Sequence, residues 1–317
     1  MNAIEIDNVT KTYGAHRAVS DLSLTVPDGT VYGFIGPNGS GKTTTLRMIM
    51  GIIYPDPGSG NISVLNQEVL GAANERVGYL PEERGLYRKM KVRDVLRFCA
   101  ELKGRRDSKQ DIADWLERLG IAEWANRPVE ALSKGMAQKV QFIASVINRP
   151  ELVILDEPFT GLDPVNAGVL KDAVLQLKRD GCTVIFSTHD MAVAEKMCDF
   201  IFMIFQGQKV LDGTLNEIQD HYGADTIRVR LEGNGSDLSA IPGVEQVDDF
   251  GQFQELRTGS DADSQTILHA LAQKGRVRHF ELTRPSLRDI FVRIAGPQAQ
   301  QAEASSPQTD RQEVNHA

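Results

Sequence analysis

One glycine-rich segment restricts the possible folds of this chain more than any other feature of its sequence. The segment runs from Gly36 to Thr43 and fits the pattern G-x-x-x-x-G-K-[ST], in which backbone N–H groups wrap nucleotide phosphates at the start of a helix. Such a loop needs a strand before it and a helix after it. The apolar run Val31–Ile35 precedes it, and residues 43–50 have a helical pattern that Gly51 can end. The sequence therefore predicts a strand, a phosphate loop and a helix in the order that the motif requires.

The residue types within this segment suit phosphate chemistry. Gly36, Gly39 and Gly41 let the backbone bend closely around phosphate. Lys42 supplies a positive charge to the β- and γ-phosphates, and the Thr43 hydroxyl can ligate Mg²⁺. The candidate ATP-binding residues of the loop are Gly36, Pro37, Asn38, Gly39, Ser40, Gly41, Lys42, Thr43 and Thr44.

Two adjacent acids follow a second apolar run, Leu152–Leu155. Asp156 comes directly after this predicted strand, so its carboxylate lies at the carboxyl edge of the sheet, where nucleotides bind in open α/β folds. We expect Asp156 to hold Mg²⁺ through water. Glu157 is the predicted catalytic residue, because hydrolysis of the γ-phosphate needs a water in line with the leaving oxygen. Adjacent acids are usually only a solvated pair, but the apolar strand before them and Pro158 after them favour a site.

A third motif, Leu132-Ser133-Lys134-Gly135-Met136, lies shortly before the acid pair. Ser133 and Gly135 open a predicted helix, which offers a hydroxyl and free backbone N–H groups to an anion. Together with the phosphate loop and the acid pair, this pentapeptide makes the chain resemble the ATP-binding cassette (ABC) ATPases. The resemblance runs from about residue 3 to about residue 220.

The resemblance implies roles for three further residues. Tyr13 stands where the family has an aromatic residue that stacks on adenine, and His189 matches the switch histidine that contacts the γ-phosphate. Glu82 occupies the position of a residue that senses Mg²⁺ and the γ-phosphate. The metal-site candidates are therefore Thr43, Glu82 and Asp156.

The pentapeptide also implies a dimer. In the family this signature closes over the ATP of the partner subunit, and Asp163 of this chain resembles a residue of the loop that links the two sites. A head-to-tail homodimer or heterodimer with two shared sites follows from the resemblance. Lys134 replaces the first glycine of the usual signature, and Met136 with Gln138 replaces the usual Gly-Gln ending.

Two features narrow the resemblance to a subgroup of exporter ATPases. Many cassettes have glutamine at the position of Glu82, whereas the subgroup carries Glu-Glu-Arg-Gly-Leu-Tyr there, as residues 82–87 do. The subgroup also has a small C-terminal domain that ends in Ser-Leu-x-x-Ile-Phe, seen here at residues 286–291, although an ordinary amphipathic helix gives the same pattern. Its members include proteins assigned to sodium or drug export, and they work with separate multi-helix membrane permeases.

Changes of pattern along the sequence predict three parts. Residues 1–222 form an ABC ATP-binding domain, an α/β P-loop cassette with a mixed sheet core and a helical subdomain at about 91–149. Residues 223–295 form a small α+β domain whose last helix runs from Pro285 to Ile294. Residues 296–317, rich in Gln, Ala, Ser and Pro, are predicted to be disordered.

Composition and charge limit the partners and the location. A net charge of −8 argues against nucleic acid as the main partner. The three cysteines form no C-x-x-C motif, which fits a reducing compartment. The N-terminus lacks the pattern of a signal peptide, and the longest apolar run, Phe200–Phe205, is too short to cross a bilayer. We expect a cytoplasmic protein, peripheral on the inner face of the cell membrane, that contacts the membrane only through its permease.

The leading hypothesis is an ATP-binding and ATP-hydrolysing exporter subunit that uses ATP and Mg²⁺ and drives the permease through ATP-dependent dimerisation. The alternative is a soluble ABC ATPase that remodels nucleic acid or ribosomes, but such relatives usually carry two cassettes or a long coiled-coil insertion. A regulatory module without hydrolysis is a third class, and Glu157 and His189 argue against it because both catalytic positions are filled. The transported substrate is not encoded here, since that specificity lies in the membrane subunit.

Overall fold

The structure is a computed structural model of the 317-residue chain. It describes residues 1–68, 75–83, 85–222, 226–232, 237–249, 251–259 and 262–305, with side chains described up to residue 296. The chain forms two compact units, which divide between Leu215 and Asn216. The boundary predicted between residues 222 and 223 therefore falls at the end of helix α7 (Leu215–Tyr222), whereas the division lies at its start.

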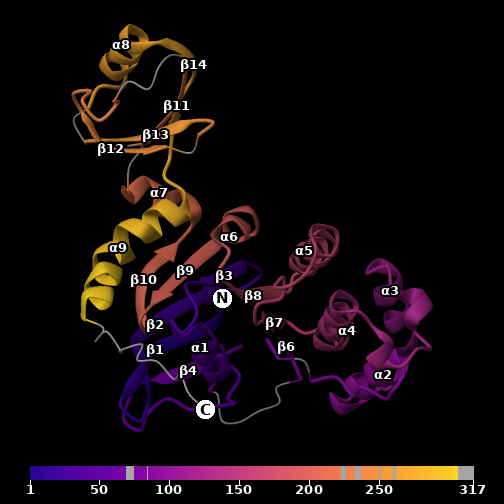
Figure 1. The fold of residues 1–317 in the computed structure, drawn as a ribbon. Coiled ribbons are helices and arrows are strands. Elements are labelled where there is room, and N and C mark those ends of the chain that lie inside the picture. The colour runs from indigo at the N-terminus through magenta and orange to yellow at the C-terminus, as the bar shows by residue number, and fades with distance from the viewer. Residues whose placement is uncertain are drawn as a thin grey trace, which may run out of the picture. The chain divides into compact units, whose positions relative to one another are not determined.

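The first unit contains a six-stranded mixed sheet that carries the phosphate loop (Figure 1). Its strands, in order across the sheet, are β10 (Gln208–Gly213), β9 (Phe200–Phe205), β3 (Val31–Ile35), β8 (Thr183–Thr188), β7 (Leu152–Leu155) and β6 (Val77–Leu80). Only the β10–β9 pair within it is antiparallel. Every residue of β3, β7 and β8 is buried, as parallel strands covered on both faces require. The predicted mixed sheet core is confirmed.

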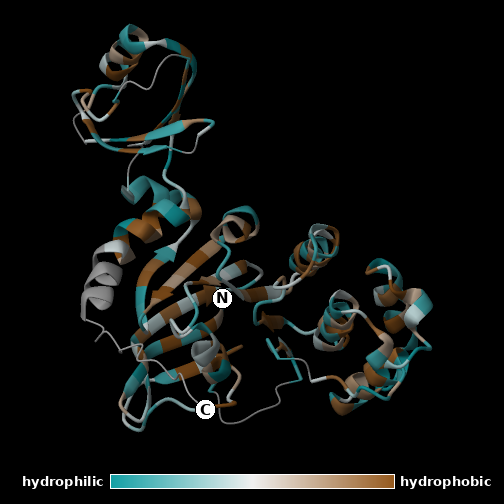
Figure 2. Cartoon of the chain, in the orientation of Figure 1, coloured by the Kyte–Doolittle hydropathy of each residue, from teal (hydrophilic) through white to brown (hydrophobic). Residues whose placement is uncertain are grey.

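A second sheet and helix α1 (Lys42–Ile49) pack on one face of the first sheet. The second sheet has the order β2 (His16–Pro27), β1 (Asn2–Tyr13), β4 (Asn61–Val64) and β5 (Gln67–Glu68). Alternate residues of the central strands, such as Phe34 and Ile154, join α1 and the second sheet in one hydrophobic core. Figure 2 shows the hydrophobic residues gathered along these strands.

The opposite face of the six-stranded sheet packs against helices. Val153 and Leu155 of β7 point into a core shared with several helices, because successive residues of a strand face opposite sides. The helices that contribute to it are α2 (Val92–Leu102), α3 (Lys109–Arg118), α4 (Lys134–Val146), α5 (Pro164–Arg179) and α6 (Met191–Met197). The first three form the helical subdomain expected at about 91–149, and Ser133 caps α4 as its position predicts.

The second unit is a small α+β fold, as predicted. Its antiparallel sheet has the order β12 (Val244–Asp249), β13 (Gln254–Thr258), β11 (Thr226–Glu232) and β14 (Arg276–Thr283). Helix α8 (Ser264–Lys274) packs on this sheet through Ile267 and Leu271. The last helix, α9 (Leu287–Ser305), runs past the predicted end near Ile294. The disorder predicted for residues 296–317 stays a prediction: α9 includes residues up to Ser305, and residues 306–317 lie outside the described residues.

Candidate functional site

The phosphate loop connects β3 to α1 and depends on its glycines. Gly36 and Gly41 have φ angles of 151° and 110°, which residues with a Cβ rarely adopt. A Cβ at Gly36 would collide with the carbonyl oxygen of Ile204, and a Cβ at Gly41 with that of Ala18. The loop backbone therefore lies directly against two neighbouring strands, and an alanine at either position would have to move it.

Lys42 folds back over the loop. Its Nζ donates to the carbonyl oxygens of Gly36 at 2.8 Å and Pro37 at 3.0 Å, and it lies 3.9 Å from Oε1 of Glu157. The side chain is only 6% exposed, and this burial lowers the pKa of Lys42, while the charges of Glu157, Asp156 and Glu82 act in the opposite direction. The ammonium is thus held inside the loop, where anionic oxygens can replace the two carbonyls.

The acid pair lies at the carboxyl end of β7, beside the loop. Asp156 is fully buried, and its Oδ1 accepts a hydrogen bond from the Thr43 hydroxyl at 3.3 Å. Its Oδ2 is also buried and has no hydrogen-bond partner in the described part of the chain. A buried carboxylate oxygen without a partner raises the free energy of the folded state unless a cation binds to it. Asp156 and Thr43 would therefore suit a Mg²⁺ ion, which prefers oxygen ligands.

The carboxylate of Glu157 is held by three neighbours. Nδ1 of His189 lies 3.1 Å from each of its oxygens, and the Thr160 hydroxyl donates to Oε2 at 2.8 Å. The third neighbour is the Lys42 ammonium described above. Glu157 is 8% exposed, whereas the side chain of His189, at the end of β8, is 52% exposed. The predicted base and the predicted switch histidine therefore meet at one edge of the sheet, with the histidine accessible from outside.

An open cavity of about 370 Å³ lies over these groups. Of the predicted catalytic, ATP-binding and metal-site residues, those that line it are Tyr13, Asn38, Gly39, Gly41, Lys42, Thr43, Thr44, Glu82 and Glu157. Tyr13 is 48% exposed, and the ammonium of Lys11 lies 5.7 Å from the centre of its ring. An exposed aromatic ring next to a phosphate loop is suited to stacking on a nucleotide base.

The signature residues and Asp163 do not line this cavity. The Ser133 hydroxyl caps α4 by accepting from the N–H of Met136 at 3.3 Å, and the ammonium of Lys134 lies against Gly161. Asp163 caps α5 by accepting from two backbone N–H groups of its first turn. The structure therefore places both motifs at helix starts, outside the cavity that the nucleotide residues of the same chain line.

Four polar residues of the site were missed from the sequence. Thr160 and Ser187 contact the acid pair directly. Gln141 of α4 donates to the carbonyl oxygens of Pro81 and Glu83, on both sides of Glu82, and Gln138 donates to that of Pro158. A signal was available, because Gln138 and Gln141 flank the apolar residues of a helix that the sequence predicts to be packed, and Ser187 follows an apolar strand run. Buried polar residues of this kind need a partner.

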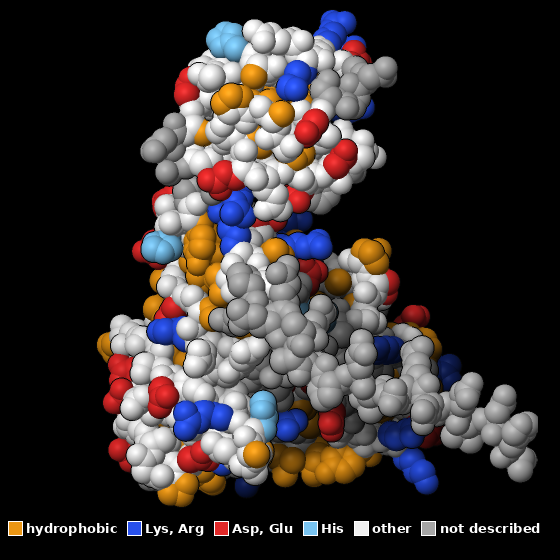
Figure 3. Space-filling model, turned by 60° about the vertical axis from the view of Figure 1, so that its left-hand side comes forward, with side chains coloured by type: hydrophobic (Ala, Val, Ile, Leu, Met, Phe, Trp, Pro, Cys, Tyr) orange, Lys and Arg blue, Asp and Glu red, His pale blue; other side chains and the backbone are white. Residues whose placement is uncertain are grey.

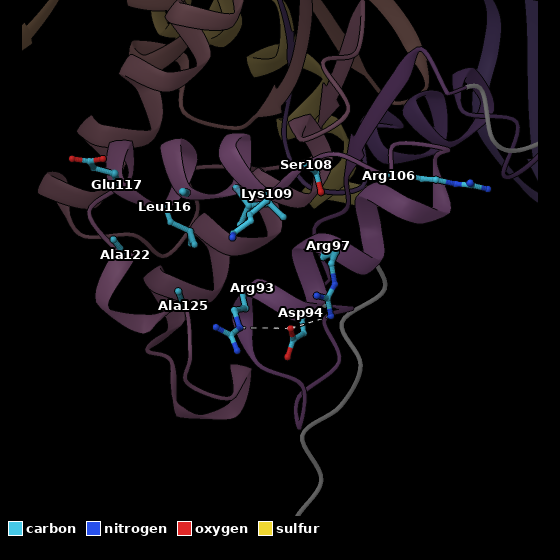
Figure 4. A pocket seen from close by; sticks show the side chains of 12 residues that line it. Arg93, Asp94, Arg97, Arg106, Ser108, Lys109, Leu116, Glu117, Ala122 and Ala125 are labelled. Carbon is cyan, nitrogen blue, oxygen red and sulfur yellow. Dashed lines mark hydrogen bonds and ion pairs between the residues drawn. The ribbon is translucent and has the colours of Figure 1, made fainter.

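A second cavity, of about 500 Å³, lies on the helical subdomain between α2 and α3 (Figure 4). Lys109 and Leu116 of α3 line it on one side, and Arg93 and Arg97 of α2 on the other (Figure 4). Both arginines contact Asp94, at 3.7 and 3.3 Å. None of the predicted nucleotide residues lines this cavity.

Comparisons with known proteins agree over most of the chain. The profile described as ABC transporter matches residues 19–160, and the profile described as ATP-binding protein DrrA1-3-like, C-terminal domain, matches residues 213–295. The ABC transporter ATP-binding protein YhaQ of Bacillus subtilis (strain 168), itself uncharacterised, is 43% identical over 92% of this chain and 98% of its own length. The linearmycin resistance ATP-binding protein LnrL of the same organism is 32% identical, again over 92% of this chain and 98% of its own.

A solved structure supports the same comparison. It is described as the structure of the ATP binding subunit of an ABC transporter, and it superposes with a TM-score of 0.65 and 29% sequence identity. The superposition covers 70% of this chain and 93% of the other. Within the described ranges, no helix combines the length and the apolar character that a membrane span needs.

Proposed function

The chain belongs to the ABC transporter ATP-binding proteins, ATPases whose hydrolysis is coupled to transport, and on this premise we propose how its own residues perform the reaction. The phosphate loop wraps the β- and γ-phosphates of ATP, and Lys42 exchanges its two loop carbonyls for phosphate oxygens. Tyr13 stacks on the adenine at the open side of the cavity.

Thr43 and Asp156 hold the Mg²⁺ that accompanies ATP, with Glu82 near the same position. The support for this is the buried, unpartnered Oδ2 of Asp156, together with the Thr43 hydroxyl on the other oxygen of that carboxylate. When bound, Mg²⁺ would supply positive charge that neutralises the phosphates. Glu82 carries a negative charge where a glutamine is usual, so we expect it to favour the metal-bound nucleotide over the free one.

Glu157 orients the attacking water and accepts its proton. The single observation that carries this assignment is the cluster around its carboxylate, in which His189, Thr160 and Lys42 fix a nearly buried base beside the phosphate loop. A base held in this way needs little reorganisation when the water attacks. His189 is the exposed member of the cluster, so it can reach the γ-phosphate from the open side.

The substitution Glu157→Gln tests this proposal. We expect it to keep ATP binding, to lower turnover by about 100-fold or more, and to accumulate an ATP-bound dimer, because the amide preserves shape but cannot take a proton. Turnover, binding of a fluorescent ATP analogue and mass by size exclusion are the measurements. Glu151→Gln is a matched control, since Glu151 lies at the other end of the same strand, paired with Arg76 at 2.6 Å. Near-normal turnover in Glu157→Gln would remove Glu157 from the catalytic role.

Two chains share their sites in a head-to-tail dimer, with Ser133, Lys134, Gly135 and Met136 of one chain over the ATP of the other. The support is the placement of Ser133 at an exposed helix start outside the cavity of its own chain. Lys134 brings a charge where the usual signature has glycine, so it can contact the partner's phosphates directly. Asp163, at the start of α5, lies in the loop that links the two sites.

The partner is a separate membrane permease at the cytoplasmic face, and the transport is export. The export assignment is supported by the resistance ATP-binding protein LnrL among the relatives and by the match of the C-terminal domain. The tagged chain should co-purify from membranes with a hydrophobic protein of several spans. Recovery of the chain from membranes with no such protein would contradict the permease partner.

We place the permease contact at the cavity between α2 and α3. Its floor is apolar. Its rim carries four basic residues, two of which are Arg93 and Arg97, and two acidic residues, Asp94 and Glu117. The rim is therefore basic although the whole chain has a net charge of −8. An acidic amphipathic segment of the permease fits this combination. The double variant Arg93→Glu, Arg97→Glu should lose permease co-purification and keep basal ATPase activity. Arg118→Glu, on α3 but outside this cavity, is the control and should keep both.

A further inference from the structure

The hydroxyl of Ser187 connects the two acids of the site. β7 and β8 pair in parallel with Leu155 opposite Phe186, so Ser187 stands beside Asp156 where β7 ends. Ser187 is fully buried. Its Oγ donates to Oδ1 of Asp156 at 2.6 Å and accepts from the N–H of Glu157 at 2.8 Å. One side chain thus holds the carboxylate of one acid and the backbone of the next.

The backbone of Glu157 needs such a contact. Its φ angle is +50°, in the left-handed region that long side chains rarely adopt. The N–H of Asp156 donates to the carbonyl oxygen of Leu80 in β6 at 2.8 Å, so the next N–H along the chain points to the opposite neighbour, β8. There the Ser187 hydroxyl takes the place of a backbone carbonyl. Without it a buried N–H would lose its partner, and the left-handed turn would lose one of its restraints.

The same hydroxyl sets the orientation of the Asp156 carboxylate. Ser187 and Thr43 both donate to Oδ1, but the bond from Ser187 is the shorter, at 2.6 Å against 3.3 Å. This leaves Oδ2 as the buried oxygen without a partner. Ser187 therefore decides which carboxylate oxygen is available to a cation.

We propose that Ser187 is a positioning residue that couples the metal-binding carboxylate of Asp156 to the backbone of the catalytic Glu157. The inference rests on the proposed function and deepens it. Removal of the hydroxyl frees the carboxylate to rotate and lets Glu157 leave its left-handed conformation. Nucleotide binding that depends on Mg²⁺ and the turnover step then weaken together, whereas contacts made by the phosphate loop alone remain.

The test compares Ser187→Ala and Ser187→Cys with Ser145→Ala. The cysteine keeps most of the volume of serine but bonds weakly. Ser145 is a matched control, because it is also buried and its hydroxyl donates to the carbonyl oxygen of Phe142 within α4, at 2.7 Å. The readouts are the thermal midpoint, the affinity for a fluorescent ATP analogue in Mg²⁺ and in EDTA, and turnover at saturating ATP and Mg²⁺.

Both Ser187 variants should bind the analogue in EDTA within about twofold of the unchanged chain. The gain in affinity from Mg²⁺ should fall by roughly tenfold, and turnover by about 10- to 100-fold, as is typical when a hydrogen bond that orients a metal ligand is lost. Ser145→Ala should match the unchanged chain in all three measurements of function. If Ser187→Ala lowers the thermal midpoint strongly, Ser187→Cys carries the test.

Two results would overturn the inference. One is an unchanged gain from Mg²⁺ in both Ser187 variants. The other is full recovery in Ser187→Cys, which would show that filled volume and not the hydrogen bond matters. Glu157→Gln, measured in parallel, tells a failure of this inference from a failure of its premise. If Glu157→Gln is inactive while Ser187→Ala is normal, only the role of Ser187 fails. If Glu157→Gln is active, the proposed catalytic role of Glu157 fails.

Discussion

The six-stranded sheet of the first unit and the four-stranded sheet of the second place their charged side chains in contrasting environments. At the end of β7, Asp156 and Glu157 are 0% and 8% exposed and both bond to the hydroxyl of Ser187. On the sheet of the second unit, the Arg278–Glu232 pair spans 2.8 Å between side chains that are 46% and 53% exposed. Figure 3 shows acidic and basic side chains interspersed on the visible surface.

The contrast follows from topology. In a parallel sheet covered on both faces, the strand ends are the only places where polar side chains can meet with little water around them. A small antiparallel sheet packed by one helix leaves its other face in water, where charges are screened. Substitutions of charged residues should therefore have large and coupled effects in the first unit, and small and independent effects in the second.

The largest effect is expected for Lys42→Ala. It removes the charge that the phosphate loop offers to ATP, and charge-assisted hydrogen bonds of this kind are each worth about 1.5–3 kcal/mol. Affinity for a fluorescent ATP analogue should fall by about 100-fold, with turnover lost. Lys209→Ala, at an exposed pair with Asp212, is the surface control and should change neither. If Lys42→Ala keeps its affinity for the analogue, the large effects expected for buried charged residues of the first unit are contradicted.

Mixing two inactive chains gives the next largest effect. Lys42→Ala damages the cavity of its own chain, and Ser133→Arg damages the signature that we assign to the partner's ATP. In a heterodimer of the two, one shared site carries both defects and the other carries none. Part of the ATPase activity should therefore return on mixing, measured against each variant alone. Heterodimers that form but stay inactive would mean that the signature serves its own chain or that both sites must be intact.

The order of strand, phosphate loop and helix was predictable because the motif and the hydrophobic pattern are local. The acid pair was predictable for the same reason, since Asp156 directly follows an apolar run. The role of Ser187 was not, because its contact with Asp156 depends on the register between β7 and β8, which lie far apart in the sequence. Thr160 is close to Glu157 in sequence, but only the left-handed turn at Glu157 brings its hydroxyl onto the carboxylate.

Residues 296–317 show a different limit of prediction from sequence. Gln, Ala and Ser after residue 296 suggested disorder, because such a segment buries little apolar surface. Ala and Gln are also good helix formers, and α9, which begins at Leu287, includes residues up to Ser305. Composition alone does not separate these two outcomes.

A smaller effect is expected when the second unit is removed. All predicted catalytic and ATP-binding residues lie in the first unit, so a chain that stops at Leu215 should stay folded and keep its ATP affinity within about threefold. We expect weaker dimerisation or weaker coupling to the permease. Titration of a fluorescent ATP analogue and ATP-driven dimerisation are compared with those of the full-length chain. A folded but non-binding truncated chain would show that the second unit completes the site.

The smallest effect is expected for Arg278→Ala in the second unit. The ion pair that it removes is half exposed on both sides, and such pairs contribute about 0.2–1 kcal/mol. Leu256→Ala in the same sheet is the contrasting variant, because Leu256 is fully buried and its truncation leaves a cavity that costs about 2–5 kcal/mol.

Both tryptophans, Trp115 and Trp124, lie in the first unit, so tryptophan fluorescence does not report on this sheet. Hydrogen exchange of the β11 amides does, because exchange of buried amides follows local opening. A large loss of protection in Arg278→Ala would mean that surface charges stabilise this sheet. It would contradict the small effects expected for charged residues in the second unit.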